Sequence, residues 1–172
     1  VYFTADGADE LFGGYKIYEN LDWKLNNSSL SPYSSINQKF FKKFKIKDKK
    51  YSQNINNFRN RVKMKYSFLK DKEEINIQTN LFCDYFIQSV KVGNACNDMI
   101  GSDNSIEIRN IFVQKDIIKE IINMPAKFKI NLNKKKNFKT KIILKRIFVK
   151  YFDKNFVFAK QGFSGFPNEI NK

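Results

Sequence analysis

The chain opens with one block that joins a strand pattern to a helix pattern: Val1-Tyr2-Phe3-Thr4-Ala5-Asp6-Gly7-Ala8-Asp9-Glu10-Leu11-Phe12-Gly13-Gly14-Tyr15. Residues 1–5 are β-branched, aromatic or small, and no turn former precedes Asp6-Gly7. Such a run predicts the end of a buried β-strand. Asp9 then begins a helical pattern whose acidic first turn faces the positive end of the helix dipole. The block therefore predicts a strand, a tight turn and a helix in succession.

Two carboxylates of this turn, Asp6 and Asp9, are three residues apart and can point into one cleft. Ligands of open α/β sheets bind at the carboxyl ends of strands. Mg²⁺ prefers one or two carboxylates together with waters and phosphate oxygens. The residues alone leave an alternative open, in which Asp6 forms an Asx turn and Asp9 caps the helix.

The Gly13-Gly14 pair costs on the order of 1 kcal/mol per glycine inside a free helix, which indicates close packing or a kink.

The rest of the chain is mostly helical in pattern. Helices are predicted near residues 35–45, 53–69, 80–99, 115–123 and 140–152, with loops at 26–32 and 160–167. Residues 105–109 alternate in polarity and are too short for a helix of their own. Met124-Pro125 ends the helix that precedes it. We therefore expect one domain over residues 1–172, mostly α, with about one β-strand.

Composition excludes several classes of function. The chain has no histidine, which excludes Cys–His and Ser–His catalysis, and it has no apolar run near the roughly 20 residues of a membrane helix. Cys83 and Cys96 form no CxxC motif, which favours a reducing cytoplasm. The net charge of +15 allows two interpretations. One is a basic helical module that binds nucleic acid or another partner, and the other, which we favour, is a solvated lysine-rich surface.

Four blocks follow one another along the chain. They are the turn block at 6–15; Asp98 with Ser-Ile-Glu-Ile-Arg at 105–109; Met124-Pro125 with Lys127 and Lys129-Ile130; and Thr-Lys-Ile-Ile-Leu-Lys at 140–145 with Lys-Gln-Gly-Phe at 160–163 and Pro167. In this order they resemble the synthetase domain of glutamine-hydrolysing asparagine synthetases. The resemblance implies an α/β parent fold of the adenine nucleotide α-hydrolase type, with a parallel sheet. The chain would be the C-terminal part of that domain.

The resemblance also implies an activity. Such enzymes are cytoplasmic, and the resemblance leaves open whether the parent protein is a homodimer. In them, Mg-ATP adenylates the side-chain carboxylate of aspartate. Ammonia from glutamine then displaces AMP. Nucleic acid and membranes are not expected partners.

Individual site residues follow from the same resemblance. Asp9 matches the ligand of the metal and pyrophosphate, and Asp6 matches a variable carboxylate of the same loop. Lys160 matches a lysine that contacts phosphates, and Glu107 a glutamate that handles protons near the acceptor. Lys141 matches either a phosphate contact or an internal ion pair. Two alternatives stay open: Lys160 as a surface lysine, and Glu107 with Arg109 as a structural ion pair. We expect Asp6, Asp9, Glu107 and Lys160 to converge at the carboxyl end of the first strand.

The chain departs from the family pattern at several points. Met99 stands where the family usually has Arg, and Ile111–Gln114 replaces Pro-Phe-Leu-Asp. The Ser-Gly-Gly-x-Asp-Ser loop that grips ATP phosphates is not found in residues 1–172, nor is an N-terminal nucleophilic Cys. The carboxylate substrate and the acceptor are therefore left open, and we expect the chain alone to lack activity.

Overall fold

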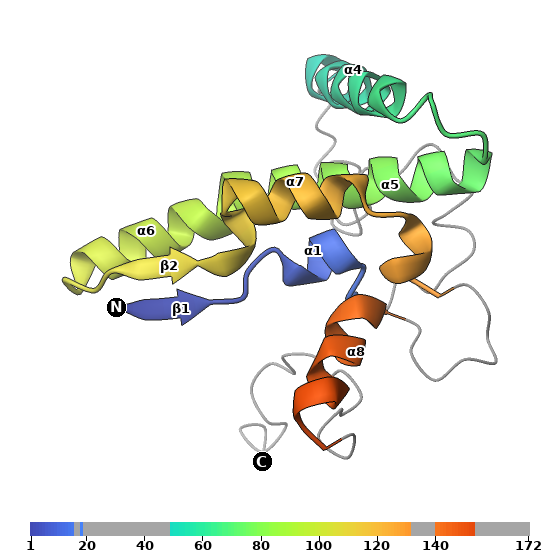
Figure 1. Cartoon of the computed structure of the whole chain (residues 1–172). Helices are drawn as coiled ribbons and strands as arrows, with labels where there is room; N and C mark the ends of the chain where they lie inside the picture. The colour runs from blue at the N-terminus through green and yellow to red at the C-terminus, as the bar shows by residue number, and fades with distance from the viewer. Residues whose placement is uncertain (16–17, 19–48, 132–139, 154–172) are drawn as a thin grey trace, which may run out of the picture.

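A computed structural model describes residues 1–15, 18, 49–131 and 140–153. The elements, shown in Figure 1, are β1 (Tyr2–Thr4), α1 (Ala8–Phe12), α4 (Lys49–Lys65), α5 (Lys72–Asp84), the π-helix η2 (Tyr85–Gly93), α6 (Asn94–Asp103), β2 (Ile108–Asn110), the 3₁₀ turn η3 (Ile111–Val113), α7 (Lys115–Asn123), the 3₁₀ turn η4 (Ala126–Phe128) and α8 (Ile142–Tyr151). The mostly helical character predicted from the sequence is confirmed. The helix predicted near residues 35–45 and the loops at 26–32 and 160–167 lie outside the described residues.

The described strands form one small parallel sheet. β1 pairs with β2 in the register Tyr2↔Ile108, Phe3↔Arg109 and Thr4↔Asn110. The expectation of about one strand is therefore corrected, because the alternating segment at 105–109 leads into a second strand. A three-residue strand is specified by its distant partner, which local pattern does not reveal. The parallel pairing agrees with the α/β character expected of the parent fold.

A continuous helical run supports the sheet. α5, η2 and α6 follow one another without a break, and Figure 1 shows this run beside the two strands. The sequence predicted one helix near residues 80–99, and that segment does stay helical throughout. Its middle, however, is a π-helix, and such segments are rare and occur frequently at functional sites. The run brings η2 against α1, and this contact builds the candidate site.

Helix α1 is fixed by buried apolar side chains. Leu11 and Phe12 are each 3% exposed and pack with Tyr85 of η2 and Ile121 of α7. Partly buried Ile143 and Leu144 of α8 close the same cluster. The short helix is therefore held between η2, α7 and α8, and the loop that precedes it is held with it.

One lysine belongs to the interior. Lys129 is 2% exposed, and its Nζ donates a hydrogen bond of 2.7 Å to Oε1 of Gln78 on α5. Burial lowers the pKa of this amine to about 7, and the nearby charge of Glu74 only partly opposes the shift. Because Gln78 is neutral, the positive charge of Lys129 has an amide acceptor but, among the described residues, no carboxylate in direct contact.

Candidate functional site

The loop after β1 is shaped by two glycines in the left-handed region. Gly7, with φ of 90°, is the N-cap of α1, and Gly13, with φ of 66°, ends it. The backbone N–H of Gly14 then donates to the carbonyl oxygen of Asp9 over 2.6 Å. Asp9 is thus not the helix cap, which removes that alternative. Its side chain lies at the carboxyl end of β1.

Asp9 forms an ion pair with the start of α8. Nζ of Lys141 lies 2.8 Å from Oδ1 of Asp9, and the two side chains are only 28% and 27% exposed. Lys141 takes a left-handed conformation, with φ of 50°, and its backbone N–H donates to the carbonyl of Phe12 over 3.0 Å. Of the two sequence alternatives for Lys141, the structure shows the internal ion pair. A backbone bond and an ion pair together hold α8 against α1.

Gly14 leaves room for this ion pair. Replacing Gly14 with Ala is expected to displace the pair, because a Cβ there would overlap the Asp9 carboxylate and the Lys141 side chain. Misplacing a site by about 1 Å can cost roughly 10²-fold in rate. We expect any activity of the intact protein to fall roughly 10–100-fold, while its melting temperature changes little. Ser102→Ala, at an exposed position of α6, should change neither, and a fully active Gly14→Ala variant would contradict the role given to the pair.

A cleft of about 250 Å³ lies between this loop and η2. On the loop side, Asp6 accepts a hydrogen bond from Nδ2 of Asn97. Glu10, only 5% exposed, accepts a hydrogen bond of 2.8 Å from the hydroxyl of Tyr15. On the η2 side lie Gln88 and Ser89, and the Ser89 hydroxyl has no hydrogen-bond partner among the described residues. The complete lining is Ala5, Asp6, Gly7, Asp9, Glu10, Tyr15, Gln88, Ser89, Val92 and Gly93.

Glu107 does not lie with these residues. Its carbonyl oxygen accepts from the N–H of Tyr2 over 2.8 Å, which places Glu107 at the amino end of both strands. The parallel register puts the turn carboxylates at the opposite end, so the expected convergence is corrected for Glu107. Its Oε1 instead lies 2.7 Å from Nε of Arg109, in an ion pair whose side chains are more than half exposed. Lys160 lies outside the described residues.

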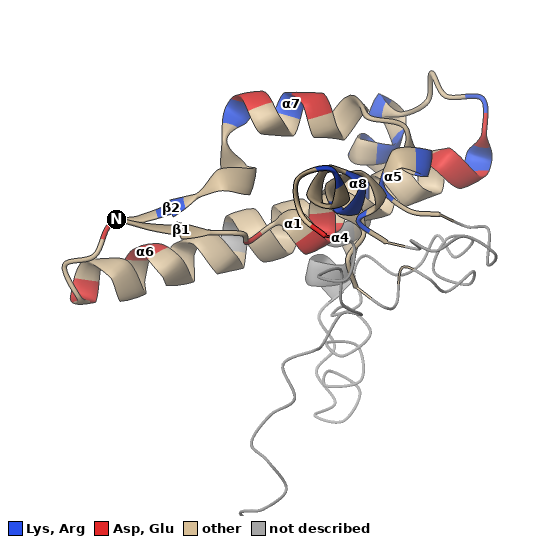
Figure 2. Cartoon of the chain, turned by 60° about the horizontal axis from the view of Figure 1, so that its bottom comes forward, with Lys and Arg blue, Asp and Glu red and all other residues tan. Residues whose placement is uncertain are grey.

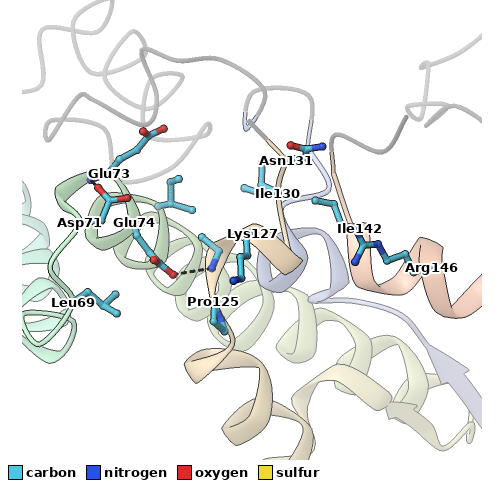
Figure 3. A pocket seen from close by; sticks show the side chains of 12 residues that line it. Leu69, Asp71, Glu73, Glu74, Pro125, Lys127, Ile130, Asn131, Ile142 and Arg146 are labelled. Atoms are coloured by element: carbon cyan, nitrogen blue, oxygen red, sulfur yellow. Dashed lines mark hydrogen bonds between the residues drawn. The ribbon is translucent and has the colours of Figure 1, made fainter. Parts of the chain in front are cut away.

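A larger cavity lies elsewhere. About 660 Å³ opens between the N-terminus of α5, η4 and the start of α8 (Figure 3). Its acidic side is engaged in structural contacts, since Glu74 accepts from the N–H of Ala126 over 3.0 Å and Asp71 caps α5 through the N–H of Glu73. Lys127 and Arg146 lie across from them, and none of the predicted site residues that the structure describes lines this cavity.

Among the described residues, the loop carboxylates are the candidates for holding a metal ion. No group of three or more His, Cys, Asp or Glu residues is placed to hold a metal in the part of the chain that the structure describes. Asp6 and Asp9 supply one or two carboxylates to the cleft, which fits Mg²⁺ because that ion keeps several waters and takes phosphate oxygens as further ligands. Among the described helices, none combines the length and the apolar character that a bilayer crossing requires.

The comparisons with known proteins decide the family. The family model for asparagine synthase matches residues 1–170. The chain belongs to the asparagine synthase family. No curated protein and no solved structure gives a match. This family consists of ATP-dependent ligases. The carboxylate-lined cleft at the carboxyl end of β1 is therefore the candidate for the ligand-binding site. Sequence reasoning missed Gln88 and Ser89, because a π-helix changes which residues share a face.

Proposed function

We propose that residues 1–172 form the C-terminal part of a synthetase domain that makes asparagine from aspartate, ATP and the ammonia of glutamine, with release of AMP and pyrophosphate. The observation that supports this best is the Asp9–Lys141 pair at the carboxyl end of β1, in a chain that belongs to the asparagine synthase family. A carboxylate oriented at a strand end beside a lysine suits a site for a metal-bound polyphosphate.

The proposed reaction has two steps. First, a carboxylate oxygen of aspartate attacks the α-phosphorus of ATP, and the bond from that phosphorus to pyrophosphate breaks. Second, the nitrogen of ammonia attacks the acyl carbon of the aspartyl adenylate, the carbon–oxygen bond to AMP breaks, and one proton leaves the nitrogen. The first step concentrates negative charge on the departing pyrophosphate.

The residues of the loop can meet that charge. Asp9 and Asp6 would hold Mg²⁺, which when bound supplies positive charge where the pyrophosphate charge develops. Lys141 keeps the Asp9 carboxylate in one orientation through its 2.8 Å contact. The hydrogen bond from Tyr15 holds Glu10 in the wall of the cleft. Lys160 is proposed, from the family motif, to add a further positive charge at the phosphates.

The test is a pyrophosphate-release assay on the intact protein that contains this chain. Release should require ATP, Mg²⁺ and aspartate together, and asparagine should accumulate when glutamine or ammonia is supplied. Release that depends on a different acid would keep the reaction class and replace the substrate. Activity with no dependence on any carboxylic acid would overturn the proposal.

The alternative function is that of a nucleic-acid-binding module, and the salt dependence of nucleic-acid affinity distinguishes the two. Figure 2 shows basic and acidic residues interspersed along α5 and α7. A binder that neutralises phosphates loses affinity steeply as salt rises. Tight, salt-sensitive binding of duplex or single-stranded nucleic acid, without adenylation, would favour the rival.

The isolated chain, residues 1–172, is expected to show no synthetase activity and little or no binding of Mg-ATP. The cleft of about 250 Å³ is smaller than typical ligand pockets of roughly 300–1,000 Å³, and the phosphate-gripping loop motif does not occur in these residues. Isothermal calorimetry with Mg-ATP checks the binding, and pyrophosphate release with aspartate and ammonia checks the turnover. Micromolar affinity or measurable turnover would show that these residues already form a complete active unit.

A further inference from the structure

Ser89 presents an unusual buried hydroxyl. The residue is 3% exposed, and its Oγ is fully buried with no hydrogen-bond partner among the described residues. Buried hydroxyls are normally bonded, and within a helix they commonly donate to the carbonyl four residues earlier. Thr79 of the preceding helix does so, with its Oγ1 2.6 Å from the carbonyl oxygen of Ile75. Ser89 lies in the π-helix η2 and makes no such bond.

The hydroxyl lies at the cleft beside the loop that follows β1. Ser89 lines that cleft, and its Oγ lies 3.4 Å from where a Cβ of residue 7 would be. Gly7 carries no side chain, so the backbone of the loop can approach Ser89 this closely. Across it, Asp9 is paired with Lys141 and Glu10 with Tyr15. The loop therefore offers its carboxylates in fixed positions, and η2 offers a hydroxyl that is still able to bond.

We propose that Ser89 contacts the ligand of this cleft, its hydroxyl donating a hydrogen bond to a phosphate oxygen of magnesium-bound diphosphate. This inference rests on the proposed function and adds one ligand-binding residue to its site. The carboxylates of Asp6 and Asp9 repel a bare diphosphate, so the anion needs its cation on their side. On the other side it needs neutral donors that add no charge, and the Ser89 hydroxyl and the Gln88 amide are groups of that kind. A hydroxyl without a partner among the described residues loses none of their bonds when it turns to the ligand.

The test pairs Ser89→Ala with Thr79→Val in the intact protein, with inorganic pyrophosphate plus Mg²⁺ as the probe. Ser89→Ala removes a buried group that lacks a partner, so its melting temperature should equal or exceed that of the wild type. Its affinity for Mg-pyrophosphate should fall about tenfold, because a hydrogen bond to a charged oxygen is lost. Thr79→Val removes an internal bond and should show the reverse: lower stability with unchanged affinity.

Calorimetric titrations with Mg²⁺ alone and with pyrophosphate plus chelator identify which species binds. Only the combined species should distinguish wild type from Ser89→Ala. A destabilised Ser89→Ala variant, an unchanged affinity, or no binding of Mg-pyrophosphate by the wild type would each overturn the proposal. The two proposals fail separately. Asparagine synthesis with no effect of Ser89→Ala removes only the role of Ser89. Ser89-dependent binding of Mg-pyrophosphate without asparagine synthesis removes only the proposed reaction.

Discussion

Replacing Asp9 with Asn, or Lys160 with Ala, is expected to lower aspartate-dependent pyrophosphate release by the intact protein roughly 10²–10³-fold. Losing one preorganised charged contact to a transition state commonly has an effect of this size. Asn keeps the volume of Asp9 but carries no charge, so it attracts a cation more weakly and forms no ion pair with Nζ of Lys141. Initial rates at saturating ATP and aspartate, measured for each variant, check the expectation.

Exposed residues of α7 supply matched controls for both variants. Asp116→Asn and Lys119→Ala change the same residue types at side chains that are 97% and 62% exposed, in a pair 4.0 Å apart. Both should retain the wild-type rate. Circular dichroism must show that the Asp9 and Lys160 variants stay folded, since the Asp9–Lys141 pair also joins α1 to α8. Near-wild-type rates in folded Asp9→Asn would remove this carboxylate from the mechanism.

Lys129 is expected to make the stability of the protein rise between pH 7 and pH 10. Its pKa is about 7 in the folded protein and 10.5 in the unfolded one, so over this range the unfolded state binds the additional proton. Stability rises with pH wherever the unfolded state binds more protons. One pKa unit corresponds to about 1.4 kcal/mol, which gives an increase of about 4 kcal/mol from this single group. Melting temperatures measured at half-unit pH steps check the slope.

Two substitutions isolate the contribution of this lysine. Lys129→Met carries no titrating amine and should lose that part of the pH dependence. Lys127→Met, at an exposed position two residues earlier, should keep the wild-type slope. Parallel profiles for wild type and Lys129→Met would show that the amine is not buried as the contact with Gln78 indicates.

The helices were predictable where the local pattern and its end signals agree. The helix expected at residues 115–123 is α7, Lys115–Asn123, because an apolar stripe ends at Met124-Pro125. The helix expected at 140–152 is α8, Ile142–Tyr151, and the opening strand is β1. In each case neighbouring residues carry the information. The strand β2 could not be predicted in this way, because its pairing with β1 depends on residues at the other end of the described chain.

The candidate site was predictable on its loop and not across the cleft. The block at 6–15 placed Asp6 and Asp9 correctly after a strand, because a tight turn keeps close neighbours together. Ser89 and the buried amine of Lys129 owe their environments to contacts with Gly7 and Gln78, which lie far away in the sequence. Glu107 was expected beside Asp9, and the register of a parallel pair sets it at the opposite end of the strands.

The parallel pairing of β1 with β2 also bears on how the chain folds. The two strands are joined through residues 5–107, so the entropy of closing a long loop is lost before any strand–strand bond forms. The helical run from α5 to α6 consists of local contacts and can form early. We therefore expect the transition state to contain these helices while β1 is still unpaired. Tyr2→Pro, which removes the bond from the Tyr2 N–H to the Glu107 carbonyl, should then speed unfolding and leave the folding rate almost unchanged, as kinetics in denaturant would show.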